Sequence, residues 1–278
     1  MPTNQNSLIG RHPTSPVFGI WLSCDDVTVT PTKCHRKLSE LVPSNDADLV
    51  EWLSKMLIKY HYDDNKIKRL KKKFADIGFP QFAEQNRSLP KADTVQKGNA
   101  AEIILTEYIQ STLNKPLIQS FRFRYNANVD QSMKGDDVLL IDSPKTPTNS
   151  NVKIYLGESK YRGTPNSQVV TDLSKALEKS KLPLSYSFLM DVLRRDKSTE
   201  ALADILDELY VKDIKANGNL IYAGLLLSNM NSHSNIETHF SNNNPNLVII
   251  SIGINNPGRL ITEAYALAES KLSKPTTL

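Results

Sequence analysis

Cysteine is scarce in this 278-residue sequence, which contains only Cys24 and Cys34. Two cysteines cannot supply the disulfide framework of a small secreted domain. Long hydrophobic runs are missing as well, because the longest, Leu220–Leu227 and Leu247–Ile254, fall far below the ~20 residues that span a bilayer. Residues 1–7 are polar and do not resemble a signal peptide. We therefore expect a cytoplasmic protein with reduced thiols and no membrane segment.

An excess of charge of one sign is also lacking. The 34 Lys and Arg residues against 30 Asp and Glu residues leave a formal net charge of +4. A balance this small identifies no partner, so any claim of nucleic-acid binding must rest on a local site. The sequence has no Walker motif and no Gly-x-Gly-x-x-Gly, so ATP dependence would have to come from a partner. No His or Cys pair has zinc-site spacing, and Ser159 lies outside any Gly-x-Ser-x-Gly elbow.

The composition that is present, 39% hydrophobic and 23% charged, is typical of a globular protein. In the first ninety residues, the pattern predicts strands over 17–24 and 27–30. It then predicts an amphipathic helix over 49–60, capped within 43–46. The segment Lys66–Lys73 places six cations in eight residues. A solvated helix face explains it most simply, and a patch that contacts phosphate is the alternative.

Pro-containing turns near residue 90 predict a boundary between an N-terminal accessory region, 1–90, and a core, 91–278. In the core, Asp93 caps a predicted helix that ends near Leu113. The remaining expected elements are strands over 117–125, 137–142 and 152–161, helices over 167–177, 186–195 and 199–210, strands over 220–228 and 247–254, and a helix over 260–272. The asparagine-rich segment 229–246 is expected to be an exposed loop. This order predicts an α/β fold with a mixed β-sheet flanked by helices.

The strongest chemical signal is the segment Ile154–Tyr161, which contains Glu158 and Lys160. Because side chains alternate along a strand, the apolar face of this strand continues directly into the two charged residues. A buried charge requires a counter-ion or a metal. Asp136 and Asp137 precede the neighbouring strand and can approach Glu158. Adjacent carboxylates repel unless a cation lies between them, which favours Mg²⁺.

A third carboxylate, Glu102, lies on the helix before these strands, with Gly98 one turn earlier to allow a close approach to the sheet. Glu102 is a candidate metal ligand, and a solvent-facing glutamate is the alternative. Lys160 would orient the attacking water and stabilise charge on a phosphodiester. Arg162 and Gln168 flank the start of the next helix, where they are candidate phosphate contacts, although a structural role is the alternative for each.

This order of elements resembles the PD-(D/E)xK nuclease superfamily over roughly residues 93–230. Four residues carry the resemblance: Glu102, Asp137, Glu158 and Lys160, with Asp136 as the alternative first aspartate. Gly135 stands where the superfamily has its proline. The resemblance implies a restriction-endonuclease-like core and hydrolysis of phosphodiester bonds with Mg²⁺, or alternatively Mn²⁺, held by Asp137, Glu158 and Glu102.

The segments Lys97–Glu102, Gly135–Asp137 and Gly157–Arg162 are similar to the HamA family, the effector nucleases of Hachiman antiphage defence. This similarity implies a metal-dependent DNA endonuclease controlled by HamB, a superfamily 2 helicase. Residues 1–90 would then carry partner contacts, with a plain structural extension as the alternative. Two other functions stay open: a restriction- or repair-type nuclease that acts without a helicase, and an inactive nuclease-fold binding subunit. The intact Asp137, Glu158 and Lys160 favour an active enzyme.

Overall fold

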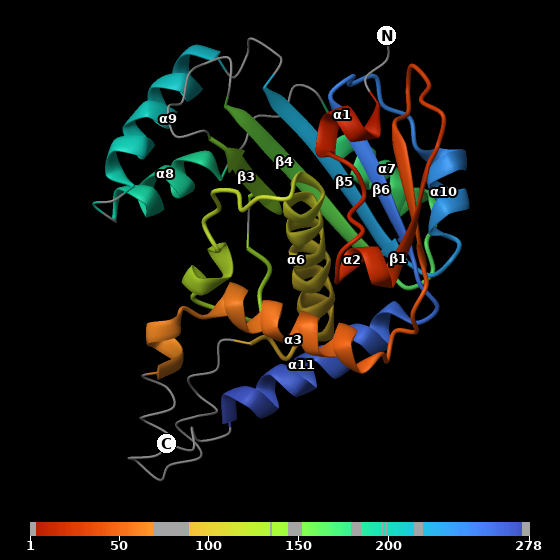
Figure 1. Ribbon diagram of the computed structural model, residues 1–278, viewed down its shortest axis with the longest axis horizontal. Helices are drawn as coiled ribbons and strands as arrows, with labels where there is room; N and C mark the ends of the chain where they lie inside the picture. Colours follow the sequence, from red (N-terminus) through yellow and green to blue (C-terminus); the bar gives the residue numbers. More distant parts are fainter. Residues whose placement is uncertain are drawn as a thin grey trace.

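The computed structural model describes residues 4–68, 89–133, 135–143, 152–178, 185–195, 197, 199–213 and 219–273. Its strands are β1 (Leu22–Asp26), β2 (His35–Glu40), β3 (Val138–Asp142), β4 (Lys153–Arg162), β5 (Leu220–Ser228) and β6 (Leu247–Gly253). They form one mixed sheet in the order β1-β2-β6-β5-β4-β3 (Figure 1). The four central strands are parallel, and β1 and β3 pair antiparallel at the two edges. The predicted mixed α/β architecture is confirmed.

Helices cover both faces of the sheet. One face packs against α1 (Gln5–Ile9), α2 (Phe18–Trp21), α3 (Ala47–His61), α6 (Asp93–Leu113) and α11 (Pro257–Ser273). The other face packs against α7 (Ser167–Ala176), α8 (Tyr186–Arg194), α9 (Glu200–Asp213) and α10 (Ser232–His239). In Figure 1, α6 runs across the front of the sheet, and α3 and α11 lie side by side below it. The sheet therefore separates two hydrophobic cores.

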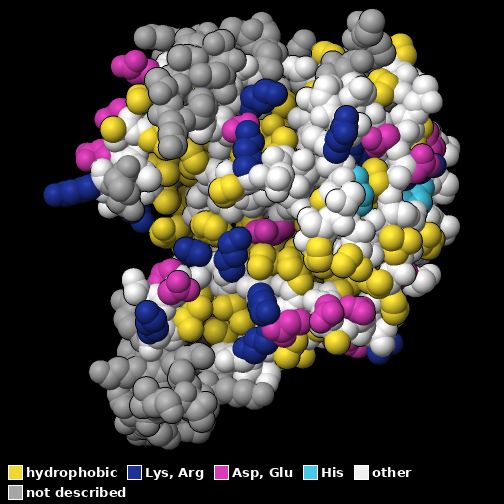
Figure 2. All heavy atoms as spheres, viewed as in Figure 1, with side chains coloured by type: hydrophobic (Ala, Val, Ile, Leu, Met, Phe, Trp, Pro, Cys, Tyr) yellow, Lys and Arg dark blue, Asp and Glu magenta, His cyan; other side chains and the backbone are white. Residues whose placement is uncertain are grey.

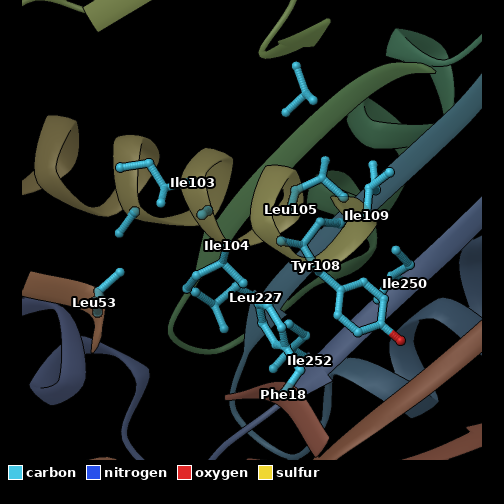
Figure 3. Packing of buried hydrophobic residues seen from close by; sticks show 14 of the residues in the cluster. Phe18, Leu53, Ile103, Ile104, Leu105, Tyr108, Ile109, Leu227, Ile250 and Ile252 are labelled. Carbon is cyan, nitrogen blue, oxygen red and sulfur yellow. The ribbon is translucent and has the colours of Figure 1, made fainter. Parts of the chain in front are cut away.

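The core around α6 joins segments from the whole chain. In Figure 3, Ile104 and Tyr108 of α6 lie among side chains of the N-terminal helices and of strands β5 and β6. The buried side chains Phe18 and Leu53 belong to the first ninety residues, yet they are part of the same cluster. Strands on both sides of residue 90 also share one sheet. The division into an accessory region and a core stays a prediction.

Most predicted elements lie where the sequence places them. The helices expected over 49–60 and 260–272 correspond to α3 and α11, and β3 to β6 match their predicted strands. Asp46 caps α3 by accepting hydrogen bonds from the backbone N–H groups of Asp48 and Leu49. In α6, Ala92 and not Asp93 is the N-cap residue, and Asp93 lies in the first turn, where its negative charge complements the helix dipole.

Four local predictions are wrong. Residues 17–24 begin with the short helix α2 before β1, and the next strand is β2, not 27–30. The segment 117–125 forms a single bridge, Ile118 to Ile141, and then the 3₁₀-helix η1 (Arg122–Tyr125). The segment 229–246 contains α10, because Ile236 buries its side chain against the sheet. Tertiary packing overrides local propensity in each case. Of the basic segment Lys66–Lys73, residues 69–73 lie outside the described residues.

Within the described residues, no helix is long and apolar enough to cross a membrane.

Candidate functional site

Strand pairing brings the two acidic strand residues together. Asp137 immediately precedes β3, and Val138 pairs with Gly157 in the antiparallel register of β3 and β4. One residue further along, Asp137 comes opposite Glu158. This register places Asp137 and Glu158 next to each other where the ladder between β3 and β4 ends. Their joint role in a site stays a prediction.

Glu158 and Lys160 continue the face of β4 that contains Ile154 and Leu156. Those two apolar residues are part of the core around α7 and α8, whereas Tyr155 belongs to the core around α6. The Lys160 Nζ donates a hydrogen bond of 2.6 Å to Glu158 Oε1. Burial lowers the pKa of Lys160, but the Glu158 hydrogen bond and the charges of Glu158 and Asp137 outweigh it, so the pKa is raised. Lys160 is therefore protonated at neutral pH.

The two neighbouring aspartates have different partners. The backbone N–H and the hydroxyl of Ser159 both donate to Asp137 Oδ2, at 2.8 and 3.1 Å. Asp136 instead accepts a 2.9 Å hydrogen bond from the backbone N–H of Ser185, the residue before α8. Asp137 lines the cleft described below, whereas Asp136 ties the β3 entry to α8.

Glu102 approaches the site from α6, on the other face of the sheet. Arg122 holds its carboxylate with two parallel hydrogen bonds, Nε to Oε1 at 2.8 Å and Nη2 to Oε2 at 2.5 Å. The same Nη2 lies 3.5 Å from Asp137 Oδ1. Burial raises the pKa of Glu102, and the charges of Asp137 and Glu158 add to this rise, whereas the charge and hydrogen bonds of Arg122 favour the ionised carboxylate.

These side chains border a cleft of about 580 Å³. Its lining includes Glu102, Arg122, Asp137, Lys160 and Arg162. Among the described residues on the face drawn in Figure 2, Lys and Arg side chains are interspersed with Asp and Glu side chains.

Two predicted site residues do not line this cleft. The Glu158 side chain is 15% exposed, and it contacts Lys160, which does line the cleft. Gln168 lies on α7, where its amide nitrogen donates to Asp172 on the same helix at 2.8 Å. Its role as a phosphate contact stays a prediction.

The donor chemistry at Asp137 and Glu158 fits a hard divalent cation. Mg²⁺ commonly binds one or two carboxylates and completes its coordination with water and substrate phosphate. Among the described residues, no three Asp, Glu, His or Cys side chains form a group that could hold a metal ion.

The structure changes the interpretation of two other residues. A Cβ added to Gly98 would have no neighbour within 4 Å, so this glycine does not mediate a close approach to the sheet. Gly157 has that role, because its Cβ would lie 2.7 Å from Val138 Cβ and 3.0 Å from Leu105 of α6.

The sequence alone does not identify Arg122 as a site residue. It predicts a strand there, and nothing local marks the pairing of Arg122 with Glu102.

Comparison with known proteins identifies the family of the chain. The HamA family model matches residues 15–268. The Hachiman protein HamA of Bacillus cereus is 34% identical over 274 residues, which covers 97% of each chain. Both matches extend over the N-terminal strands as well as the cleft. The chain belongs to the HamA family.

Proposed function

We propose that this chain is the DNA endonuclease of a Hachiman antiphage defence complex, with a PD-(D/E)xK core, acting in the cytoplasm. The observation that carries the proposal is that Asp137 and Lys160 line one cleft at the end of the β3–β4 ladder, where Lys160 is hydrogen-bonded to Glu158. A lysine next to paired carboxylates suits the hydrolysis of a phosphodiester bond, where negative charge develops on oxygen. The HamA relative supports the assignment to the Hachiman system.

In the proposed reaction, Asp137 and Glu158 would hold the metal ion, Mg²⁺ or alternatively Mn²⁺. Such an ion would supply Lewis-acid polarisation of the phosphoryl group. The Ser159 hydrogen bonds hold Oδ2 of Asp137, and Oδ1 lies 3.5 Å from Arg122 Nη2. Lys160, kept protonated by Glu158, orients the attacking water and stabilises the charge that develops on the phosphate oxygens.

We further propose that a HamB-like superfamily 2 helicase delivers the DNA and controls the cleavage. The small net charge of +4 supports this proposal. Proteins that grip DNA through its phosphates usually present a concentrated basic surface. A partner that holds the duplex would remove the need for one here.

Cleavage of plasmid DNA tests this function. The purified chain is incubated with plasmid and Mg²⁺, alone and with the helicase encoded beside it. We expect nicking or degradation that EDTA abolishes and that Glu158→Ala or Lys160→Ala reduces on the order of 100-fold or more. The matched controls are Glu263→Ala and Lys271→Ala, which alter charges on α11 away from the cleft.

Each alternative has its own outcome in this experiment. Retained cleavage by Glu158→Ala, or cleavage in EDTA, would refute the mechanism. Full cleavage without a helicase would favour a restriction- or repair-type nuclease. DNA binding without cleavage under every condition would favour an inactive binding subunit.

A further inference from the structure

Both oxygens of the Glu102 carboxylate are already used by one side chain. Arg122 binds them in the parallel, two-bond geometry that matches guanidinium to carboxylate. Each of the two side chains is only 10% exposed. A carboxylate that is neutralised and held in this way is a poor donor for an additional cation. The pair instead fixes the direction of the guanidinium plane.

One nitrogen of that guanidinium is left without an acceptor. Arg122 Nη1 is buried, and it has no hydrogen-bond partner in the described part of the chain. Buried polar groups are normally paired, so an unpaired donor on a charged group requires an explanation. Arg122 as a residue lines the cleft with Lys160 and Arg162, so a phosphate that enters the cleft would come close to its guanidinium group. Phosphate is also the ligand that the guanidinium group recognises best.

The backbone just before Arg122 is in an unfavourable conformation. Phe121 has φ of +46°, in the left-handed region that a bulky side chain rarely adopts. Its ring packs edge-on against Tyr60 of α3, with the ring centres 5.2 Å apart. Such strain persists only where surrounding contacts maintain it, and it is concentrated at functional sites. Here it directs η1, and with it Arg122, toward Glu102 and Asp137.

We propose that Arg122 binds a non-bridging phosphate oxygen of the DNA, and that Glu102 is its positioning residue and not a metal ligand. This assignment rests on the proposed function of the same cleft. It replaces the role that the sequence suggests for Glu102, and it agrees with two metal-binding carboxylates, Asp137 and Glu158. Glu102 then acts on the substrate only through Arg122.

Two binding measurements separate the roles of these residues. Titration calorimetry with Mn²⁺ alone measures metal affinity. Fluorescence anisotropy with a short DNA duplex in Ca²⁺, checked by gel for intact DNA, measures substrate affinity. The variants are Glu102→Gln, Arg122→Gln, their double mutant and Asp137→Asn, all in the full-length chain.

We expect Arg122→Gln and Glu102→Gln to weaken duplex binding about tenfold, because a charged hydrogen bond at the phosphate is lost or misdirected. Both variants should keep the Mn²⁺ affinity within about twofold, because neither residue is a metal ligand in this proposal. The double mutant should lose no more duplex affinity than Arg122→Gln, because Glu102 acts through Arg122. Asp137→Asn should weaken Mn²⁺ binding at least about tenfold. Arg122→Lys, which keeps the charge and favours folding, should bind the duplex with intermediate affinity.

The control for Glu102→Gln is Glu107→Gln, because Glu107 lies on the same helix but is bonded to Lys59 and Tyr60. The control for Arg122→Gln is Arg194→Gln, because Arg194 is paired with Asp204 and Asp207 and does not line the cleft. Both should bind Mn²⁺ and DNA like the unchanged protein. Loss of Mn²⁺ binding in Glu102→Gln to the extent seen in Asp137→Asn would overturn the inference. So would unchanged duplex affinity in Arg122→Gln and Arg122→Lys. If the unchanged protein binds no metal, the proposed function fails while the duplex measurements still test Arg122.

Discussion

At the scale of single residues, two glycines of the site differ in the space around them. Gly157 lies where β4 passes under α6, and an added Cβ would meet Val138 at 2.7 Å. Gly98 lies within α6 itself, with open space at its Cβ. Absence of a side chain therefore matters at Gly157 for packing, whereas at Gly98 it only weakens the helix.

We predict opposite effects of alanine at these two positions. Gly157→Ala should lower the free energy of unfolding by about 1–3 kcal/mol, because the helix and the strand must move apart. Gly98→Ala should raise it by up to about 1 kcal/mol, because alanine favours the helical backbone. Urea unfolding followed by circular dichroism measures both changes. Equal stabilities of the two variants would contradict the packing shown for Gly157.

The residue scale also explains why Asp137, and not Asp136, faces the cleft. Successive side chains of an extended segment point in opposite directions. Ser185 engages one aspartate, and Ser159 engages the other. Sequence spacing leaves both candidates open, because neither serine is close to the aspartates along the chain.

At the scale of elements, the C-terminal end of α3 supports the segment that contains Arg122. His61, which is 2% exposed, stacks on Phe123 of η1 with ring centres 4.9 Å apart. Its Nδ1 donates to the Leu57 carbonyl oxygen, and its Nε2 accepts from the Asn99 amide. The contact with Asn99 requires the neutral ring, because a protonated Nε2 could not accept a hydrogen bond. Burial lowers the pKa of His61 from 6.5 to about 4.

This shift predicts a loss of stability in mild acid. Between the pKa of about 4 in the folded state and 6.5 in the unfolded state, only the unfolded chain takes up the proton. The contribution to folding is therefore complete above pH 6.5 and falls as the pH drops toward 4, by up to about 3 kcal/mol. Urea unfolding at pH 7.5, 5.5 and 4.5 measures it.

A matched pair of variants isolates the contribution of His61. His61→Gln should be less stable at pH 7.5, and its stability should depend less on pH over this range. His239→Gln, at the exposed end of α10, should retain the pH dependence of the unchanged chain. The same pH dependence in all three proteins would show that His61 is not the source.

At the scale of the whole molecule, the N-terminal segments complete the sheet. Strand β2 lies between β1 and β6, so removing it exposes the edge of a buried parallel strand. Arg36 of β2 is fully buried, and it bonds Asp26 of β1 and the Gly10 carbonyl oxygen. An exposed apolar strand edge promotes aggregation. The described N-terminal segments therefore have a structural role, and partner contacts by residues 1–90 stay a prediction.

We predict that a fragment of residues 91–278 does not fold on its own. It would lack β1, β2 and α3, and it would expose the apolar face of α6 that Phe18 and Leu53 cover (Figure 3). We expect insoluble protein, or soluble protein without a cooperative thermal transition. The full-length chain prepared in parallel is the control. A monomeric fragment that unfolds cooperatively would instead support the predicted boundary near residue 90.

The sequence by itself determined most elements of the core and the order of its charged residues. The periodicity of α6 and the apolar runs of β5 and β6 are local patterns, so they predict those elements without knowledge of their neighbours. The alternation in β4 likewise places Glu158 and Lys160 on one face. Their approach to Asp137 follows from pairing two strands that are consecutive in the chain.

Only the tertiary structure decided the features that depend on distant contacts. The pairing of β2 with β6, the burial of Ile236 in α10 and the Arg122–Glu102 ion pair each join residues through packing that no local pattern encodes. Residues 117–125 have the alternation of a strand. The backbone at Phe121 is left-handed and its ring contacts Tyr60, so the chain changes direction there and residues 122–125 form η1. Burial between α6 and the sheet then makes Arg122 and Glu102 partners, because neither charge is stable there alone.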